Sequence, residues 1–338
     1  MKIVVNGPLE KPVSFKTISF SIYKVLKEFN FKVIYVPYDT NYINIKHIDL
    51  SNINIWIRYS HPFSFNYIKN IASKVKTIGI GPFDYLFYGI KYIISDISVV
   101  NMYFTHVEKY VNIFRKYVNN VYYFPLGYLK EYFNTNGRVE SDYVRICMIT
   151  RFENRENPYS LIYIAKHLKS INKIFIRIHS DSIVDSKILR DVIDVFNRYS
   201  VKYYIQIGYV NLSKFSKFLK QCDIVVLVSE YECGIAQIPE CIACNCIPIV
   251  SSHSCMVEYV NKLNLPNYVI VNGNIVGYLN PVIEKVSYNI SDFINKLEYL
   301  LDYNIRKEVL SKASSKIEEF EYRNIVKKYL INNLFKYD

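Results

Sequence analysis

Glycine is scarce in this chain, with 10 residues among 338, and several motifs that mark large enzyme classes are absent. There is no phosphate-binding loop ending in Lys-Ser or Lys-Thr, no His-Glu-x-x-His and no Gly-x-Ser-x-Gly. These absences argue against a P-loop nucleotidase, a zinc protease of the His-Glu-x-x-His type and an α/β-hydrolase. Gly79-Ile80-Gly81 lacks the third glycine of a dinucleotide fingerprint, which disfavours a Rossmann oxidoreductase.

Long uninterrupted hydrophobic runs are also missing. The most apolar stretch, residues 85–104, is broken by Lys91 and Asp96 and is only about one membrane span long. We therefore expect a buried helix followed by a buried strand there. The opening residues, MKIVVNGP, have a strand pattern without the apolar core and cleavage site of a signal peptide. Together with an odd number of cysteines, seven, this favours a reduced, cytoplasmic compartment.

The composition is that of a folded protein with anionic partners. Hydrophobic residues make up 51% of the chain and charged residues 21%, which is too apolar for disorder, and the length predicts about two domains. The 42 Lys and Arg against 30 Asp and Glu give a net charge of +12. Such a charge favours nucleotide phosphates, nucleic acid or an anionic membrane surface, without choosing among them.

Short apolar segments alternate with longer amphipathic ones, which is typical of βα units and parallel sheets. In the first half we predict strands at 2–5, 32–36, 53–58, 77–80, 98–104 and 121–124, with helices at 15–29 and 107–117. In the second half we predict strands at 143–149, 174–178, 203–207, 224–228 and 247–250, with helices at 159–168, 187–199, 212–221, 291–301, 304–320 and 322–335. The polar segment 134–138 predicts a domain boundary. Two doubly wound α/β domains imply a cleft, with ligands at the carboxyl ends of the strands.

Residues 227–250 are the most informative part of the sequence. An apolar strand leads into a loop with Glu232 and Gly234, and Pro239 and Glu240 are expected to start a helix. Gly234 lets backbone approach a ligand closely, and the start of the helix offers free N–H groups to an anion. The residues alone leave an alternative open, in which Glu240 complements the helix dipole and Glu232 is a solvated loop carboxylate.

Glu232 and Glu240 in this arrangement, followed by a small-residue helix and Cys246-Ile-Pro-Ile-Val250, resemble the GT-B glycosyltransferases of the family 4 type. Further segments resemble that family in the same order: 124–127, 149–158, 208–210, 222–223, 292–313 and 321–322. The resemblance implies two Rossmann-like domains, an N-terminal acceptor-side domain at 1–138 and a C-terminal nucleotide-sugar domain at 139–320. Residues 321–338 would form a helix that packs back on the first domain. The implied activity is that of a hexosyltransferase-type enzyme, which transfers a sugar from a nucleotide diphosphate sugar with retention.

The resemblance also implies roles for residues of the second domain. Arg151 matches the basic residue that contacts the donor diphosphate, and the family's lysine falls at Glu156, so we expect Arg155 to substitute for it. Glu240 matches the carboxylate that binds the ribose hydroxyls, and Glu232 the one at the donor sugar. No metal is expected, because no Asp-x-Asp pair occurs and the arginines would stabilise the leaving diphosphate. No cofactor beyond the donor substrate is expected either.

In the first domain, residues 6–14, with Gly7 and Ser14, resemble a donor-facing loop, and residues 58–62 resemble an arginine-histidine-proline segment found in one branch of the family. We expect His61 or Asp84 to act as acid/base near the acceptor. Cys241, Cys244 and Cys246 suggest zinc, but no fourth ligand has suitable spacing, so we expect buried thiols.

Three functions stay open. The first is a sugar transferase whose acceptor is a glycan, lipid, protein or nucleic acid, with possible peripheral contact to an anionic membrane. The second is a degenerate GT-B domain that binds nucleotide sugar without turnover, because the family's lysine and glycines are replaced here. The third is a nucleic-acid-binding or nucleic-acid-modifying protein, suggested by the charge. The sequence does not indicate the oligomeric state.

Overall fold

The structure, a computed structural model, describes residues 1–8, 13–38, 49–61, 64–65, 68–82, 89–280 and 282–335, apart from the side chains of residues 13–15. Its contacts divide the chain into two compact units. Unit 1 comprises Met1–Gly127, Tyr278–Ile283 and Glu319–Asp338, and unit 2 comprises Tyr128–Gly277 and Glu284–Glu318.

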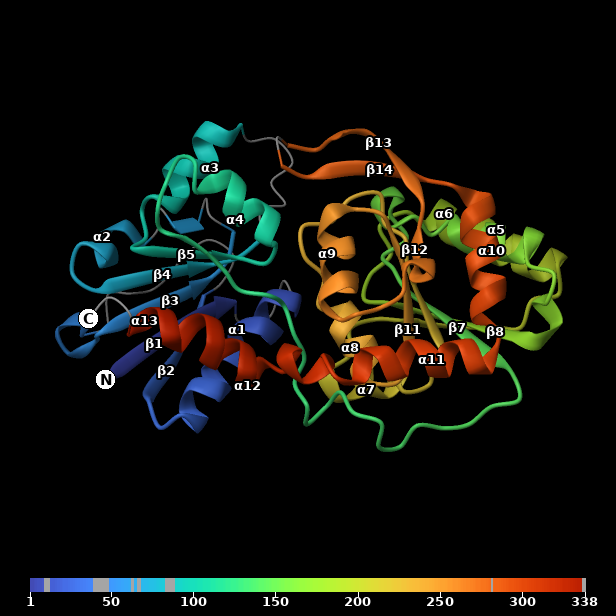
Figure 1. Cartoon of the computed structure of the whole chain (residues 1–338), viewed down its shortest axis with the longest axis horizontal. Helices are drawn as coiled ribbons and strands as arrows, with labels where there is room; N and C mark the ends of the chain where they lie inside the picture. Colours follow the sequence, from blue (N-terminus) through green and yellow to red (C-terminus); the bar gives the residue numbers. More distant parts are fainter. Residues whose placement is uncertain are drawn as a thin grey trace. The chain divides into compact units, whose positions relative to one another are not determined.

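Unit 1 is built on a six-stranded parallel sheet with the strand order β2-β1-β3-β4-β5-β6. Ile3, Val4 and Val5 of β1 are fully buried, because β1 is a central strand and helices cover both faces of the sheet (Figure 1). The strands are β1 (Lys2–Pro8), β2 (Lys32–Tyr38), β3 (Ile55–Tyr59), β4 (Lys76–Ile80), β5 (Met102–Thr105) and β6 (Val121–Tyr123).

The helices of unit 1 connect these strands. They are α1 (Val13–Glu28), the short η2 (Leu50–Asn52), α2 (Lys69–Ala72), α3 (Ile90–Ile97) and α4 (Glu108–Phe114). Helix α3 packs through Ile93 and Ile97 and leads to the buried strand β5, which confirms the expected helix and strand in the most apolar stretch. Within the described part of the chain, no helix combines the length and apolarity needed to span a bilayer.

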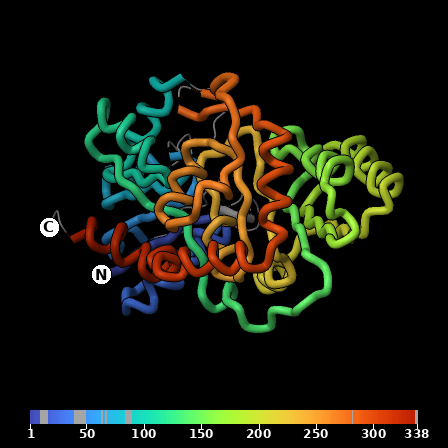
Figure 2. The backbone as a smooth tube through the Cα atoms, turned by 45° about the vertical axis from the view of Figure 1, so that its right-hand side comes forward, coloured from blue at the N-terminus to red at the C-terminus, as the bar shows by residue number. Residues whose placement is uncertain are grey.

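The end of the chain belongs to unit 1. After η7 (Ile317–Phe320), helix α12 (Tyr322–Ile325) and the π-helical segment η8 (Val326–Ile331) contact α1, and α13 (Asn332–Leu334) follows. The guanidinium of Arg323 lies 5.7 Å from the centre of the Phe29 ring. Figure 2 shows this segment in red beside the blue N-terminal elements. The C-terminal helix therefore returns to the first unit, as expected.

Unit 2 repeats the architecture with a second parallel sheet, in the order β12-β11-β10-β7-β8-β9. Its strands are β7 (Val144–Ile149), β8 (Ile174–Ser180), β9 (Tyr203–Ile207), β10 (Ile224–Leu227), β11 (Ile247–Ser251) and β12 (Ile270–Val271). A two-stranded ribbon of β13 (Gly273–Tyr278) and β14 (Glu284–Tyr288) follows, which the sequence did not predict. The α/β class with two doubly wound sheets is confirmed.

Several helices of unit 2 begin with a side-chain cap, and the helix at Ser186–Arg198, α6, is an amphipathic example. Ile188, Val192 and Phe196 form the buried stripe of α6, and the Asp185 carboxylate accepts the Lys187 backbone N–H at its start. The helices are α5 (Ser160–His167), α6 (Ser186–Arg198), α7 (Leu212–Leu219), α8 (Gln237–Ala243), α9 (Ser254–Lys262), α10 (Ile290–Leu300) and α11 (Tyr303–Ser314), with short η4 (Asn154–Glu156), η5 (Ile171–Lys173) and η6 (Asn267–Val269).

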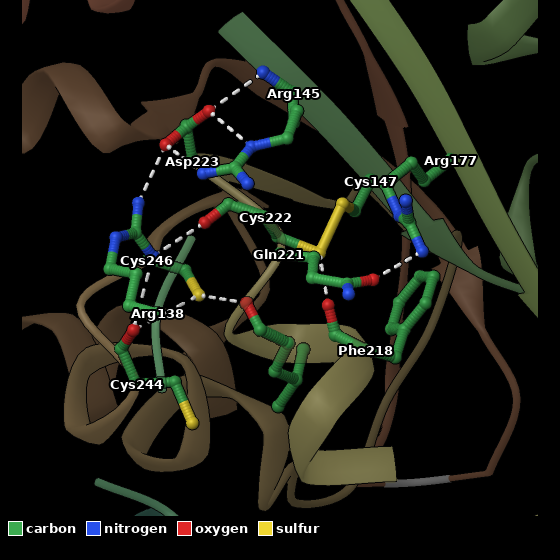
Figure 3. The surroundings of a disulfide bond; sticks show 11 residues. Arg138, Arg145, Cys147, Arg177, Phe218, Gln221, Cys222, Asp223, Cys244 and Cys246 are labelled. Carbon is green, nitrogen blue, oxygen red and sulfur yellow. Dashed lines mark hydrogen bonds and ion pairs between the residues drawn. A yellow bond between two sulfur atoms is a disulfide. The ribbon is translucent and has the colours of Figure 1, made fainter. Parts of the chain in front are cut away.

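A disulfide joins two neighbouring strands of unit 2 (Figure 3). Cys147 of β7 and Cys222, just before β10, are fully buried, and their Cα atoms are 5.8 Å apart. The expectation of reduced cysteines is therefore wrong for this pair, because the adjacency of β7 and β10 brings together residues 75 positions apart. The other five cysteines are buried free thiols, as expected for 241, 244 and 246.

Asp223 ties together the amino ends of the same two strands (Figure 3). Its carboxylate accepts the backbone N–H of Arg145 at 2.8 Å, the Arg145 Nε–H at 3.1 Å and an Arg138 Nη2–H at 2.6 Å. Arg138 also donates to the carbonyls of Cys222 and Cys244. Asp223 therefore stabilises the sheet at the amino ends of its central strands, opposite the carboxyl ends.

Candidate functional site

The candidate site of unit 2 lies where the strand order reverses. From β7 the chain continues to β8 and β9 on one side of the sheet, and then to β10, β11 and β12 on the other. The loops that leave the carboxyl ends of β7 and β10 therefore meet, at the position where doubly wound sheets bind their ligands. Arg151 and Arg155 follow β7, and Glu232 follows β10.

The structure brings three of the predicted residues into one ion-pair network. Nη1 of Arg155 donates to Oε1 of Glu232 at 2.8 Å, and Nη2 donates to Oε1 of Glu156 at 2.8 Å. Arg151 Nε lies 3.4 Å from the same Glu156 oxygen. The Arg151 side chain is 43% exposed and that of Arg155 22%. Arg151 thus faces solvent, whereas Arg155 forms the partly buried centre of the network.

Glu153 completes this network, and sequence reasoning missed it. Its Oε1 accepts hydrogen bonds from Arg151 Nη2 at 2.7 Å and from Arg155 Nε and Nη2 at 3.0 and 2.9 Å. Burial alone would raise the pKa of Glu153, but the two guanidinium groups hold that pKa below its usual range. Burial likewise opposes the charge of Arg155, but Glu232, Glu156 and Glu153 raise its pKa. Both shifts favour the charged forms of Glu153 and Arg155.

Backbone contacts hold the loop after β7 against the loops after β10 and β8. The backbone N–H of Glu230 donates to the carbonyl of Arg155 at 2.7 Å, and Val184 N–H donates to the carbonyl of Arg151 at 2.8 Å. The Arg155 guanidinium also lies 5.6 Å from the centre of the Tyr231 ring. The arginines are consequently presented from a fixed backbone.

Glu240 lies in the first turn of α8, as expected, but the helix starts at Gln237 and not at Pro239. Proline is tolerated at this third position because the first four N–H groups of a helix have no partner within it. The Glu240 side chain is 6% exposed, and within the described residues its carboxylate has neither an ion-pair nor a hydrogen-bond partner. Burial raises its pKa to about 8.

Gly234 separates the two glutamates in a conformation that side chains rarely adopt, with φ of 141°. After the loop, the His253 ring donates from Nε2 to the Ser229 carbonyl at 2.7 Å, and Glu284 accepts the N–H of Ser254 at 3.0 Å. Burial lowers the pKa of His253, so its ring is neutral. The first contact anchors the start of the glutamate loop to the start of α9, and the second joins α9 to β14.

The remaining predicted residues belong to unit 1. Gly7 is the sixth residue of β1, and a Cβ there would clash with the Ser19 side chain and lie 2.6 Å from the Tyr35 hydroxyl. Close packing of α1 against β1 therefore requires glycine at this position. Ser14 lies in α1 with its side chain outside the described set, and Asp84 lies outside the described residues altogether.

His61 follows β3, and its carbonyl accepts the Ser64 backbone N–H and hydroxyl at 3.1 and 2.8 Å. Beside it, buried Arg58 donates to Asn6 Oδ1 at 2.6 Å and to the Ser64 hydroxyl at 3.1 Å. The Arg58 guanidinium stacks 4.2 Å from the centre of the Tyr38 ring. The carboxyl ends of β1, β2 and β3 thus share one polar cluster around an arginine.

Known proteins resemble this chain in fold and not in sequence. No protein-family model and no curated protein sequence matches it. Sucrose-phosphate synthase from Thermosynechococcus elongatus superposes with a TM-score of 0.72 at 10% identity, over 100% of this chain and 98% of the other. A glycosyltransferase from Rickettsia africae gives 0.73 at 14%, over 99% and 97%. The Anabaena HepE protein, solved with UDP and glucose, gives 0.69 at 9%, over 100% of both chains.

These superpositions cover the whole chain and show its fold, which is GT-B, with two Rossmann-like domains. No cluster of three or more His, Cys, Asp or Glu side chains suited to a metal is found in the described ranges.

Proposed function

We propose that this protein is a glycosyltransferase of the hexosyltransferase type, which transfers a sugar from a nucleotide diphosphate sugar to an acceptor with retention and without a metal. One observation carries the proposal: Arg151, Arg155 and Glu232 meet at the point of strand reversal in unit 2 of a GT-B fold. Two similar structures support the choice of donor, one solved with UDP and glucose and one bound with UDP-2-fluoro glucose.

In the proposed reaction, four residues of unit 2 bind and orient the donor. The leaving diphosphate gains negative charge as the glycosidic bond breaks, and Arg151 and Arg155 stabilise that charge. Glu240 accepts the ribose hydroxyls, and Glu232 orients the donor sugar. The acid/base group near the acceptor is His61 or Asp84.

A ligand screen tests the proposal. UDP, GDP and ADP and their glucose derivatives are added to the protein, and the melting temperature is followed, since a ligand at one hundred times its Kd adds about 2.7 kcal/mol to the free energy of unfolding. We expect stabilisation by one nucleotide family. Release of the nucleotide diphosphate from the matching sugar donor, in the presence of EDTA, then tests metal-free turnover. A strict requirement for magnesium or manganese contradicts metal-independent transfer. If no nucleotide stabilises the protein, the proposed glycosyltransferase function is contradicted.

A second candidate is a GT-B domain that binds nucleotide sugar without turnover. The observation that favours it is the network itself, in which three glutamates surround two arginines and Glu156 stands where the family has lysine. Binding of a nucleotide sugar without release of its diphosphate, over a panel of glycan and lipid acceptors, would select this candidate.

A further inference from the structure

Carboxylates engage every nitrogen of the Arg155 guanidinium. Nε and Nη2 donate to the same oxygen of Glu153, Nη2 also donates to Glu156, and Nη1 donates to Glu232. The Nε and Nη2 edge is one with which arginine binds carboxylates and phosphates through two parallel hydrogen bonds. Glu153 therefore occupies the edge of Arg155 that a donor phosphate would need.

Glu153 differs from Glu156 in the groups that its side chain contacts. Its Oε1 bridges Arg151 and Arg155, in the way that one phosphate oxygen could, and all of its described side-chain hydrogen bonds go to these two guanidinium groups. Glu156, in contrast, also accepts the backbone N–H of Arg151, which ties it to the shape of the loop. Glu153 precedes η4 without capping it through its side chain. It can leave the arginines without breaking a backbone contact.

The net charge of the network also disfavours binding of a diphosphate. Two arginines and three glutamates give a net charge of −1, which repels a diphosphate as long as all three carboxylates stay in place. The side chain of Glu153 is 23% exposed and therefore borders solvent. Glu153 does not lose its negative charge by protonation at neutral pH, because the two guanidinium groups outweigh the effect of burial and keep its pKa low.

We propose that Glu153 is an internal competitor for the donor diphosphate and thereby sets the affinity of the site, an inference that rests on the proposed function. When a diphosphate binds, its oxygens replace Glu153 Oε1 on Arg151 and Arg155, and the glutamate turns to solvent. Glu153 acts through the two arginines and does not touch the reacting atoms.

Calorimetric titration with inorganic pyrophosphate and with UDP tests this. Pyrophosphate probes the diphosphate position whatever the base. Glu153→Gln keeps the size of the side chain and removes its charge, and Glu153→Ser removes the carboxylate altogether; both should bind pyrophosphate about tenfold or more tightly than wild type. Glu153→Asp keeps the charge and should remain near wild type. Glu308→Gln, which removes one charge of the exposed Glu308–Lys312 pair on α11, controls for the change in net charge and should have no effect.

A purely structural role for Glu153 predicts the opposite sign, since loss of the network would disorder the arginines. If wild type binds UDP but both neutral variants bind pyrophosphate equally or more weakly, the competitor role is overturned and the proposed function stands. If wild type and variants bind neither UDP nor pyrophosphate, the inference is overturned together with the proposed function.

Discussion

Arg155 and Glu232 are 77 residues apart in the sequence, yet their side chains form a hydrogen bond of 2.8 Å between Nη1 and Oε1. The bond joins the loop after β7 to the loop after β10, which are adjacent because those strands pair in the sheet. One further bond, from Glu230 N–H to the Arg155 carbonyl, fixes the same junction. The basic loop and the glutamate loop therefore form one candidate site.

The two arginines should differ in what their loss does to stability. Arg151→Ala and Arg155→Ala should each weaken UDP binding about tenfold or more, since charge-assisted hydrogen bonds contribute about 1.5–3 kcal/mol each. Only Arg155→Ala removes the cation that all three carboxylates share, while Arg151 still contacts Glu153 and Glu156, so the variant's free energy of unfolding should fall by about 1–3 kcal/mol. Arg151, which is half-exposed, should change it by less than about 1 kcal/mol. Urea denaturation and calorimetry measure both quantities.

Arg190, exposed on α6 of the same unit, provides a matched control. Arg190→Ala should leave UDP affinity and stability unchanged. Equal UDP affinity in wild type and in both site variants would show that the basic loop has been assigned wrongly.

The fold was largely predictable from the sequence, because parallel strands buried on both faces stand out as short runs of valine and isoleucine. Residues 203–207 were predicted with the bounds that β9 has. The predicted helix at 304–320 instead ends at Ser314 and continues as η7. Strand β13 of the ribbon was missed because its residues 274–276 are all exposed and show no alternation of buried and exposed positions.

The site was predictable only in part. Motif spacing singled out Arg151, Arg155 and Glu232, which the structure brings into one network, but the position of Glu153 between the two guanidinium groups depends on side-chain contacts that spacing does not contain. The same holds for the disulfide, since pairing of Cys147 with Cys222 requires the strand order of the sheet. Long-range side-chain contacts follow from topology, which the linear pattern only implies.

Reduction of the disulfide should destabilise unit 2. A bridge between residues 75 positions apart restricts the unfolded chain, and bridges of this kind contribute about 2–4 kcal/mol to the free energy of unfolding. Urea denaturation with and without a phosphine reductant measures the loss. The double variant Cys147→Ala/Cys222→Ala should resemble reduced wild type and should not respond to the reductant. A response of the double variant equal to that of wild type would assign the effect to other cysteines.

Glu240 should make stability depend on pH. Burial raises its pKa from 4.5 to about 8 in the folded protein, so between these values the unfolded chain loses a proton that the folded protein keeps. The free energy of unfolding should therefore fall as the pH rises from 4.5 to 8, by roughly 5 kcal/mol at most, and this contribution should be constant above and below that window. Glu240→Gln removes the dependence, so its stability relative to wild type should grow between pH 5 and pH 8.5. If urea denaturation gives the same difference in free energy of unfolding between Glu240→Gln and wild type at pH 5 and at pH 8.5, the raised pKa of Glu240 is contradicted.

The two glutamates of the loop and helix should fail differently in function. Glu240→Gln should weaken binding of UDP itself, because an ionised carboxylate accepts both ribose hydroxyls and an amide offers only one acceptor oxygen. Glu232→Gln should leave UDP affinity nearly unchanged, or slightly tighter, since it also removes a carboxylate from Arg155. Its kcat should fall, because the lost contact acts mainly on the reacting sugar.

The measurement is UDP affinity and turnover for both variants side by side at pH 8.5, where the carboxyl group of Glu240 in wild type is largely ionised. Glu298→Gln, whose carboxylate accepts the Ser170 N–H at 3.1 Å elsewhere in unit 2, controls for loss of a structural carboxylate. Its kcat and UDP affinity should match wild type even if its stability falls. Wild-type affinity and turnover in both site variants would return Glu232 and Glu240 to ordinary structural carboxylates, because a shared fold alone does not establish an activity.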